Sequence, residues 1–135
     1  MLNRLLPVLI LLAAPLWAAE VQVMPGAGTL TEAIAGAAPG DVLRLSEGTY
    51  AGPVVIDRTL TLTGAAGAVV DGQGQGTVIT VTADDVVVRG ITVTGSGRLN
   101  ADLDSGIKIV KGADRALIDG NSIIGNLHGV DVHGG

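Results

Sequence analysis

The chain alternates between apolar runs of three or four residues and short polar turns. Val86–Val88 and Ile91–Thr94 are separated only by Arg89-Gly90, and a longer polar loop, Gly95–Asp104, precedes Ile107–Val110. Runs this short are poorly suited to a hairpin sandwich, whose strands are usually longer. They favour a coil of strands, in which each run pairs with the equivalent run one turn away.

The runs recur with a period near 23 residues and fall into three classes. The first class is spaced by 24, 29 and 23 residues, and its widest interval contains the Gly95–Asp104 loop. Three short strands per period predict an all-β fold, a right-handed, three-sided parallel β-helix, in preference to a β-sandwich. The classes are Val54, Val78, Ile107 and Val130; Leu60, Val86 and Ala116; and Val69, Ile91 and Ile123.

A short helix is predicted ahead of the strands. Thr29 and Glu32 have the spacing of a capping box, and Pro39-Gly40 ends the pattern. Such a helix can cover the open end of the strand stack. Its apolar face has i, i+3, i+4 and i+7 spacing and consists of Leu30, Ala33, Ile34 and Ala37.

The N-terminal segment is typical of a signal peptide. Arg4 precedes the apolar run Leu5–Ala14, and cleavage is expected after Ala18 or Ala19, with a retained anchor as the alternative. We therefore divide the chain into a signal peptide at 1–19, a leader with the cap helix at 20–40, and β-helix turns at 41–135. The turns are expected to continue in a longer protein.

Composition supports a narrow, layered interior. The chain has one Trp, one Tyr and no Phe among 135 residues, so branched aliphatic residues must fill the core. It has no Cys, so an exported form would be held together without disulfides. The formal net charge of −5 argues against nucleic acid and anionic membranes as partners.

The long loop carries candidate ligands for a hard cation. Asn100, Asp102 and Asp104 alternate, and an extended loop would direct all three oxygens to one side. The EF-hand pattern fails, however, because Gly106 comes one residue late and Lys111 replaces the final Glu. Solvated loop acids are therefore the favoured interpretation.

Two carboxylate pairs could supply a general acid and base, namely Asp102/Asp104 and Asp84/Asp85. The sequence offers almost no aromatic rings to stack on sugars, and Asp84-Asp85 occupies a corner where such residues are common. No nucleophile–base pair, phosphate-binding loop or zinc motif is present. The sequence thus indicates a protein that is not an enzyme.

Copper is the metal that the remaining donors suit, because imidazole and thioether bind it well. The candidate ligands are His128, His133, Asp131 and Met24, with ordinary surface histidines as the competing interpretation. Asn121 and Asn126 each follow a glycine at a corner, and we expect them to bond backbone groups of neighbouring turns.

Three long segments of the chain carry a resemblance: PGDVLRLSEGTYAGPVVIDRTLTLTG, VVDGQGQGTVITVTADDVVVRGITVTGSGRLNADLDSGI and GNSIIGNLHGVDVHG. The PGD–EGTY run and the DGxGxG pattern are typical of many β-helix proteins. The segment that contains the long loop, followed by GNSIIGNLHGV, is more specific. Together these segments resemble a known family, the NosD-type maturation proteins of nitrous-oxide reductase.

The resemblance implies a periplasmic accessory protein, not a hydrolase. Its implied partners are an ABC transporter complex and nitrous-oxide reductase, and its implied role is to bind copper or hand it over during maturation of the copper centres. The long loop would then present a partner surface through Arg98, Asn100, Asp102 and Asp104. NosD-type proteins are much longer, and this chain is poor in Met, His and Cys. The alternative is a carbohydrate-active or carbohydrate-binding β-helix protein.

Overall fold

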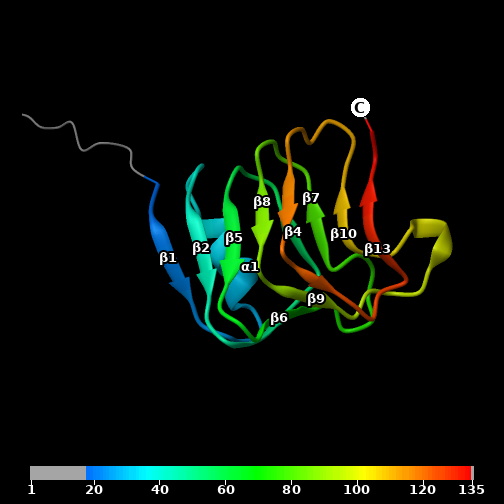
Figure 1. The fold of residues 1–135 in the computed structure, drawn as a ribbon, viewed down its shortest axis with the longest axis horizontal. Coiled ribbons are helices and arrows are strands. Elements are labelled where there is room, and N and C mark those ends of the chain that lie inside the picture. Colours follow the sequence, from blue (N-terminus) through cyan, green and yellow to red (C-terminus); the bar gives the residue numbers. More distant parts are fainter. Residues whose placement is uncertain (1–17, 135) are drawn as a thin grey trace, which may run out of the picture.

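The computed structural model describes residues 18–134, which form a right-handed, three-sided parallel β-helix (Figure 1). One sheet of five strands and two sheets of four run along the axis, and every strand pair is parallel. The predicted fold class is confirmed. Apart from Ala18 and Ala19, the predicted signal peptide lies outside the described residues.

Each turn contributes one strand to each of the three sheets. Sheet A contains β1 (Glu20–Val23), β2 (Val42–Leu45), β5 (Thr61–Gly64), β8 (Val87–Arg89) and β11 (Leu117–Asp119). Sheet B contains β3 (Gly48–Ala51), β6 (Ala68–Asp71), β9 (Thr92–Thr94) and β12 (Ser122–Ile123). Sheet C contains β4 (Val54–Ile56), β7 (Ile79–Val81), β10 (Ser105–Ile109) and β13 (His128–Val132). The helical segments are α1 (Thr29–Gly36) and a 3-10 turn, η1 (Asn100–Asp102).

Branched aliphatic side chains form continuous columns along the interior. In sheet A, Leu43 pairs with Leu62, Leu62 with Val88, and Val88 with Ile118. The first three are completely buried. Neighbouring strands lie about 4.8 Å apart, so successive side chains of a column are in contact. Burying one such side chain contributes about 1.5–3 kcal/mol.

The predicted register is correct in sheet A, and in sheet C it is correct from Ile107 to Val130. Elsewhere it slips. Val54 pairs with Ile79 rather than with Val78, and Val69 pairs with Thr92 rather than with Ile91. In sheet B, Ile123 pairs with Val93, two residues beyond Ile91. Val78 and Ile91 are both buried at the corner just before the strand. Because the corner residue is as apolar as the strand, hydrophobicity alone cannot locate the first paired residue.

Two strands were not predicted. β1 lies in the segment that the sequence predicts as a leader, yet it pairs with β2 along its whole length and extends sheet A. β3 begins with Gly48 and lies outside the three predicted strand classes, but it pairs with β6 and directs Tyr50 into the interior. Both strands contain few apolar residues, and partners one turn away supply the pairing that their own sequences do not indicate.

Helix α1 covers the first end of the stack, where it contacts β1, β3 and β4 and buries Leu30 and Ile34. The predicted capping box is wrong. Gly28 is the N-cap, so Thr29 is the first helical residue, and its buried hydroxyl has no partner among the described atoms. A shift of one residue removes the hydroxyl from the capping position. Within residues 18–134 no helix has the length and apolarity needed to cross a membrane.

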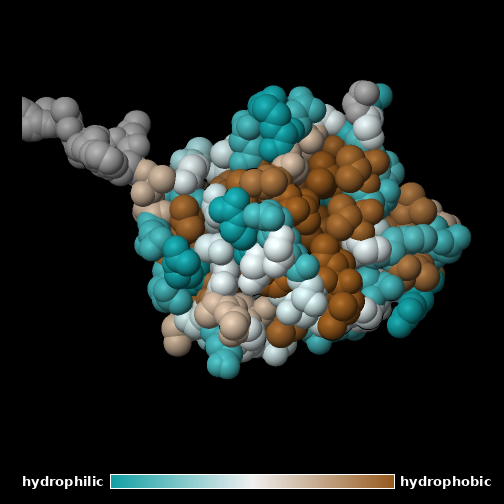
Figure 2. Space-filling model, viewed as in Figure 1, coloured by the Kyte–Doolittle hydropathy of each residue, from teal (hydrophilic) through white to brown (hydrophobic). Residues whose placement is uncertain are grey.

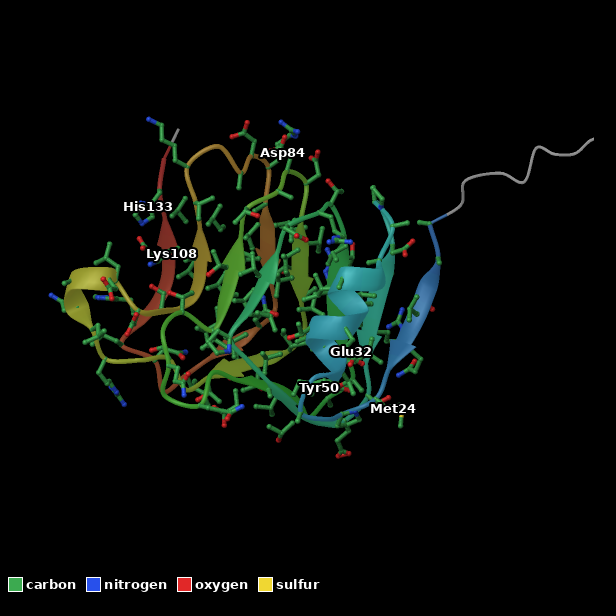
Figure 3. The ribbon with its side chains drawn as sticks, turned by 180° about the vertical axis from the view of Figure 1, so that it is seen from behind. Met24, Glu32, Tyr50, Asp84, Lys108 and His133 are labelled. Atoms are coloured by element: carbon green, nitrogen blue, oxygen red, sulfur yellow. The ribbon has the colours of Figure 1, made fainter. Side chains whose placement is uncertain are left out.

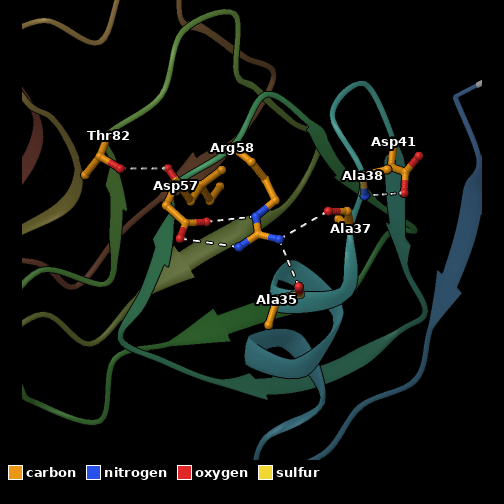
Figure 4. A network of polar contacts seen from close by, with 8 residues as sticks. Ala35, Ala37, Ala38, Asp41, Asp57, Arg58 and Thr82 are labelled. Carbon is orange, nitrogen blue, oxygen red and sulfur yellow. Dashed lines mark hydrogen bonds and ion pairs between the residues drawn. The ribbon is translucent and has the colours of Figure 1, made fainter.

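Arg58 joins the other end of α1 to the strands (Figure 4). Its Nη1 donates to the carbonyl oxygens of Ala35 and Ala37 at 2.8 and 3.2 Å, while its Nε donates to Asp57 at 2.9 Å. The last carbonyls of a helix have no partner within the helix, and a guanidinium can satisfy them. Arg58 therefore fixes the cap helix on the first turn of the solenoid.

The corner asparagines bond backbone groups of the preceding turn, as predicted. The Ile91 N–H donates to Asn121 Oδ1 at 3.1 Å, and Asn121 Nδ2 donates to the Val88 carbonyl at 2.9 Å. Each amide therefore satisfies one donor and one acceptor that the sharp corner would leave unpaired.

Apolar side chains are exposed at the last turn. In Figure 2 they gather in a band beyond β11, and the exposed fractions there reach 63%. The strands of this turn pair on one side only, because β11, β12 and β13 each stand at the edge of a sheet. The exposed side chains are Leu117, Ile124, Val130 and Val132.

The Tyr50 hydroxyl joins the first two turns, and replacing it tests how much this contact stabilises the protein. Its buried hydroxyl lies 2.8 Å from the carbonyl oxygens of both Val23 and Ser46, and burial raises the pKa of Tyr50. Tyr50→Phe should lower the free energy of unfolding by about 1–3 kcal/mol in urea titrations, because the carbonyls of Val23 and Ser46 lose the hydroxyl proton that they share. Thr49→Val, on the exposed side of β3, should change it by less than about 0.5 kcal/mol. Equal effects would contradict this role of the hydroxyl.

Candidate functional site

The loop between β9 and β10 extends outward beside β13 at the far end of the solenoid from α1 (Figure 1, yellow). We call residues 97–104 the projecting loop. It replaces a short corner between sheets B and C and contains η1. It is therefore an insertion into one turn, mounted on a regular stack of strands.

A buried carboxylate joins the two ends of this loop. Asp104 is only 3% exposed, and its Oδ2 accepts the Leu99 N–H at 2.8 Å. A Cβ on Gly97 would overlap this carboxylate, so the backbone approaches Asp104 more closely than any other residue type would allow. The loop is thus closed at its base by a specific contact.

The following turn supports the same base. Asn126 Oδ1 accepts the Ser96 N–H at 3.0 Å, and its Nδ2 donates to the Val93 carbonyl at 3.0 Å. The buried Ser96 hydroxyl accepts the Leu127 N–H at 2.8 Å and donates to the Gly97 carbonyl at 2.9 Å. This network satisfies the polar groups that the loop buries.

Two side chains from sheet C hold the outer part of the loop. Lys108 Nζ donates to the Asp102 carbonyl at 2.7 Å, and His128 Nε2 donates to Asn100 Oδ1 at 3.1 Å. Both contacts end on η1, so β10 and β13 keep the loop in one orientation. Because each contact is exposed, it contributes less to stability than the buried base does.

Two leucines are exposed on the outer surface of the loop, although most of its other residues are polar. Leu99 is 63% exposed and Leu103 is 37% exposed. Leu103 has a φ of +54°, a left-handed conformation that is unusual for a bulky residue and costs of order 1 kcal/mol. Strain of this kind is most common at functional sites.

The structure does not bring the three loop oxygens together. The side chain of Asn100 is bound to His128, Asp102 faces solvent, and Asp104 is buried at the base. The three side chains therefore do not face one side of the loop as a cation site would need, and the favoured interpretation of solvated loop acids holds for Asp102 but not for Asp104. Of the four residues expected to present a partner surface, Arg98, Asn100 and Asp102 are exposed, whereas Asp104 is not.

The second carboxylate pair contributes to a corner ladder. Asp84 Oδ1 accepts the Asp114 N–H at 2.8 Å, and Arg115 contacts the two oxygens of Asp85 at 2.8 and 2.9 Å. The hydrogen bonds from Arg115 hold the pKa of Asp85 below its ordinary value. A carboxyl with a lowered pKa is a poor general acid at neutral pH.

The four candidate copper ligands do not come together. His128, Asp131 and His133 lie on or directly after β13, whereas Met24 lies at the opposite, α1 end (Figure 3 shows Met24 and His133). His133 Nε2 lies 2.8 Å from Asp131 Oδ2, whereas His128 contacts Asn100. No group of three His, Cys, Asp or Glu side chains within residues 18–134 is placed to hold a metal. These residues do not fit a preformed copper site.

Sequence reasoning missed three features of this site. Nothing in the sequence indicates that Lys108 supports η1 or that Ser96 fixes the base of the loop. The two leucines carried a usable signal, because they are the apolar residues of an otherwise polar loop.

Replacing Asp104 should loosen the projecting loop. Asp104→Ala leaves the partly buried Leu99 N–H without its acceptor, so we expect a loss of about 1–3 kcal/mol in the free energy of unfolding. Cleavage by trypsin after Arg98 should be at least several-fold faster. Asp102→Ala is the matched control, because the Asp102 side chain is exposed. Equal protease sensitivity in the two variants would contradict the role of Asp104.

Comparison with known proteins gives relatives of one kind. No protein-family model matches the chain. Two relatives named probable ABC transporter binding protein NosD come from Pseudomonas aeruginosa, with 42% identity over 86 residues, and Stutzerimonas stutzeri, with 37% over 91 residues. These matches cover 64% and 67% of this chain but 20% and 21% of the relatives. A third relative of the same name, from Pseudomonas aeruginosa, is 40% identical over 65 residues, which is 48% of this chain and 60% of that protein.

A solved structure has the same fold. A variant of the PL6 family alginate lyase AlyGC matches with a TM-score of 0.64 and 28% identity, over 77% of this chain and 15% of the lyase. The chain spans about a fifth of the length of the first two curated relatives. Within that span it is similar in sequence to the NosD proteins, and the predicted resemblance to this family is confirmed.

Proposed function

We propose that this chain is the docking part of an exported accessory protein in the maturation of the copper centres of nitrous-oxide reductase, acting together with an ABC transporter. The resemblance to NosD proteins supports a role in the nitrous-oxide reductase system. The relatives' name, probable ABC transporter binding protein, supports a transporter as the partner. The predicted signal peptide supports a periplasmic location. The projecting loop is the observation that carries the docking role.

The loop has the properties of a preorganised binding surface. Its base is fixed by partly buried hydrogen bonds in which the side-chain oxygens of Asp104, Ser96 and Asn126 accept backbone N–H groups, so little conformational entropy is lost when a partner binds. Leu99 offers an apolar anchor, and the polar side chains around it form a rim. The surrounding contacts, among them the bond from Ser105 Oγ to the Leu103 carbonyl, keep Leu103 in its left-handed conformation. These features favour a protein partner over a small ligand.

Copper in this proposal is cargo that passes between the partners. Met24 lies at the opposite end from the three donors at β13, and there His128 makes a contact separate from that of Asp131 with His133, which favours a chain that positions its partners over one that holds the metal in a site of its own. The zero cysteine count points the same way, because thiolates are the strongest donors for Cu(I).

A carbohydrate-active protein is the second candidate, and the alginate lyase of similar fold is the observation in its favour. Three features oppose it. The Tyr50 ring is buried, and it is the only Phe, Tyr or Trp among residues 18–134. The Asp84-Asp85 pair is engaged in the corner ladder, and Asp104 is buried. Fold alone does not specify activity. Release of reducing or unsaturated ends from uronic-acid polymers would favour this candidate.

Leu99 should be needed for docking. Leu99→Asp places a charge at the centre of the proposed contact, so affinity for the solubilised transporter complex or for apo-reductase should fall at least tenfold in surface-binding measurements. Val55→Asp is the matched control, because Val55 is 52% exposed on sheet C, outside the loop. Equal affinities for the two variants and the parent chain would contradict docking through this loop.

Copper competition tests whether the chain itself holds the metal. The purified chain and the His128→Ala/His133→Ala variant are titrated with Cu(I) in the presence of a competing chelator. We expect the same weak competition from both, because the candidate donors do not converge. Tight, stoichiometric binding that the double variant loses would show instead that the histidines form a copper site.

A further inference from the structure

Asp41 is a buried carboxylate at the corner between α1 and β2, and it is 6% exposed. Its Oδ1 accepts the Ala19 N–H at 2.9 Å, and its Oδ2 accepts the Ala38 N–H at 2.9 Å (Figure 4 shows the second bond). These hydrogen bonds, that from Ala19 first, lower the pKa of Asp41. Among the ion pairs of residues 18–134, none involves Asp41. The carboxylate is therefore charged, buried and held by backbone N–H groups.

Ala19 is fixed through both of its backbone polar groups. Its carbonyl accepts the Val42 N–H at 2.8 Å, and the next residue, Glu20, pairs with Val42 as β1 begins. Ala18 and Ala19 are both exposed. The bond that joins them therefore lies on the surface, immediately before the first strand.

The sequence leaves two cleavage positions open, after Ala18 and after Ala19, each with a small residue before the bond. Cleavage after Ala19 would remove the donor to Asp41 and the acceptor of the Val42 N–H. Cleavage after Ala18 would keep both contacts and convert the donor from an amide into an amine.

We propose that the Ala18–Ala19 bond is the processing site of this chain, and that the new α-ammonium group of Ala19 forms an ion pair with Asp41. A leader peptidase adds water across the amide, so that the carbonyl carbon of Ala18 gains hydroxyl and the nitrogen of Ala19 gains a proton. At neutral pH the resulting amine takes up a further proton, and the leader departs with a carboxylate.

The ion pair would strengthen a contact that already has the right geometry, because a charged donor makes a shorter and stronger hydrogen bond than an amide. It joins β1 to the corner that precedes β2, and so seals the first end of sheet A. Processing would thus be coupled to stability, since the chain gains this contact only after the leader is removed.

The proposal predicts a specific dependence of stability on pH. A carboxylate partner raises the pKa of the α-amine above its unfolded value of about 8. The ion pair therefore stabilises the folded chain fully at pH values below the unfolded pKa of the amine, and this stabilisation is lost as pH rises through the raised folded pKa. Charged side chains on the adjoining elements form pairs of their own and keep their charge between pH 7 and 10: Glu20 with Arg44, and Asp57 with Arg58.

The first test identifies the amino terminus. The 135-residue chain is produced in a Gram-negative host, and the exported form is examined by intact mass and N-terminal sequencing. We expect a protein that begins at Ala19. A form that begins at Glu20, or one that retains the leader, would overturn the proposal.

The second test measures urea unfolding of the processed chain at pH 7 and pH 9.5. The folding equilibrium constant should fall about tenfold for each unit by which the folded pKa of the amine exceeds the unfolded value. Asp41→Asn should remove most of this fall, whereas Asp57→Asn, at the same end, should keep it.

An extended form of the chain provides a second control in case the Asp41→Asn variant does not fold. This form starts with Gly before Ala18, so that Ala19 keeps its amide, and its stability should not change over the same pH interval. An equal fall in the processed and extended forms would overturn the ion pair, whatever the outcome of the partner-binding experiments.

Discussion

In-register stacking of one turn on the next is the constraint on which the whole structure depends. Each backbone N–H of a strand needs a carbonyl one turn away, and each inward side chain needs an apolar neighbour above and below it. The column of Leu43, Leu62 and Val88 satisfies both conditions. A slip of one residue would turn every side chain of a strand to the other face. Branched aliphatics of similar volume meet this requirement better than aromatics do.

The corners must satisfy polar groups that the strands leave over. Asn121 and Asn126 each bond a donor and an acceptor of the preceding turn, and Asp84 receives an N–H from the following turn. Asp84 and Asp104, which suggest catalysis or metal binding in the sequence, therefore accept backbone N–H groups. This explains how a fold shared with an alginate lyase can carry acidic residues in this chain without an arranged acid–base pair.

The projecting loop is compatible with the stack because it leaves at a corner and returns to the same corner. The cost of ordering it is offset by the buried contacts of Asp104 and Ser96, which tie it to its own base and to the next turn. A rigid loop on a rigid solenoid can present Leu99 in one orientation, which a flexible insertion of the same length could not do. Rigidity of the scaffold is thus the physical link between the fold and the proposed docking role.

The sequence by itself determined the period, the three strand classes, the parallel β-helix and the role of the corner asparagines, because these follow from local patterns repeated along the chain. Only the tertiary structure decided the register at Val78 and Ile91, the burial of Asp104 and the contact of Asp41 with Ala19. Each of these depends on which residues meet across a turn or across a loop, and the Asp41 contact spans 22 positions. A local pattern shows that a residue is apolar or charged, whereas its partner is set by the stacking of the whole coil.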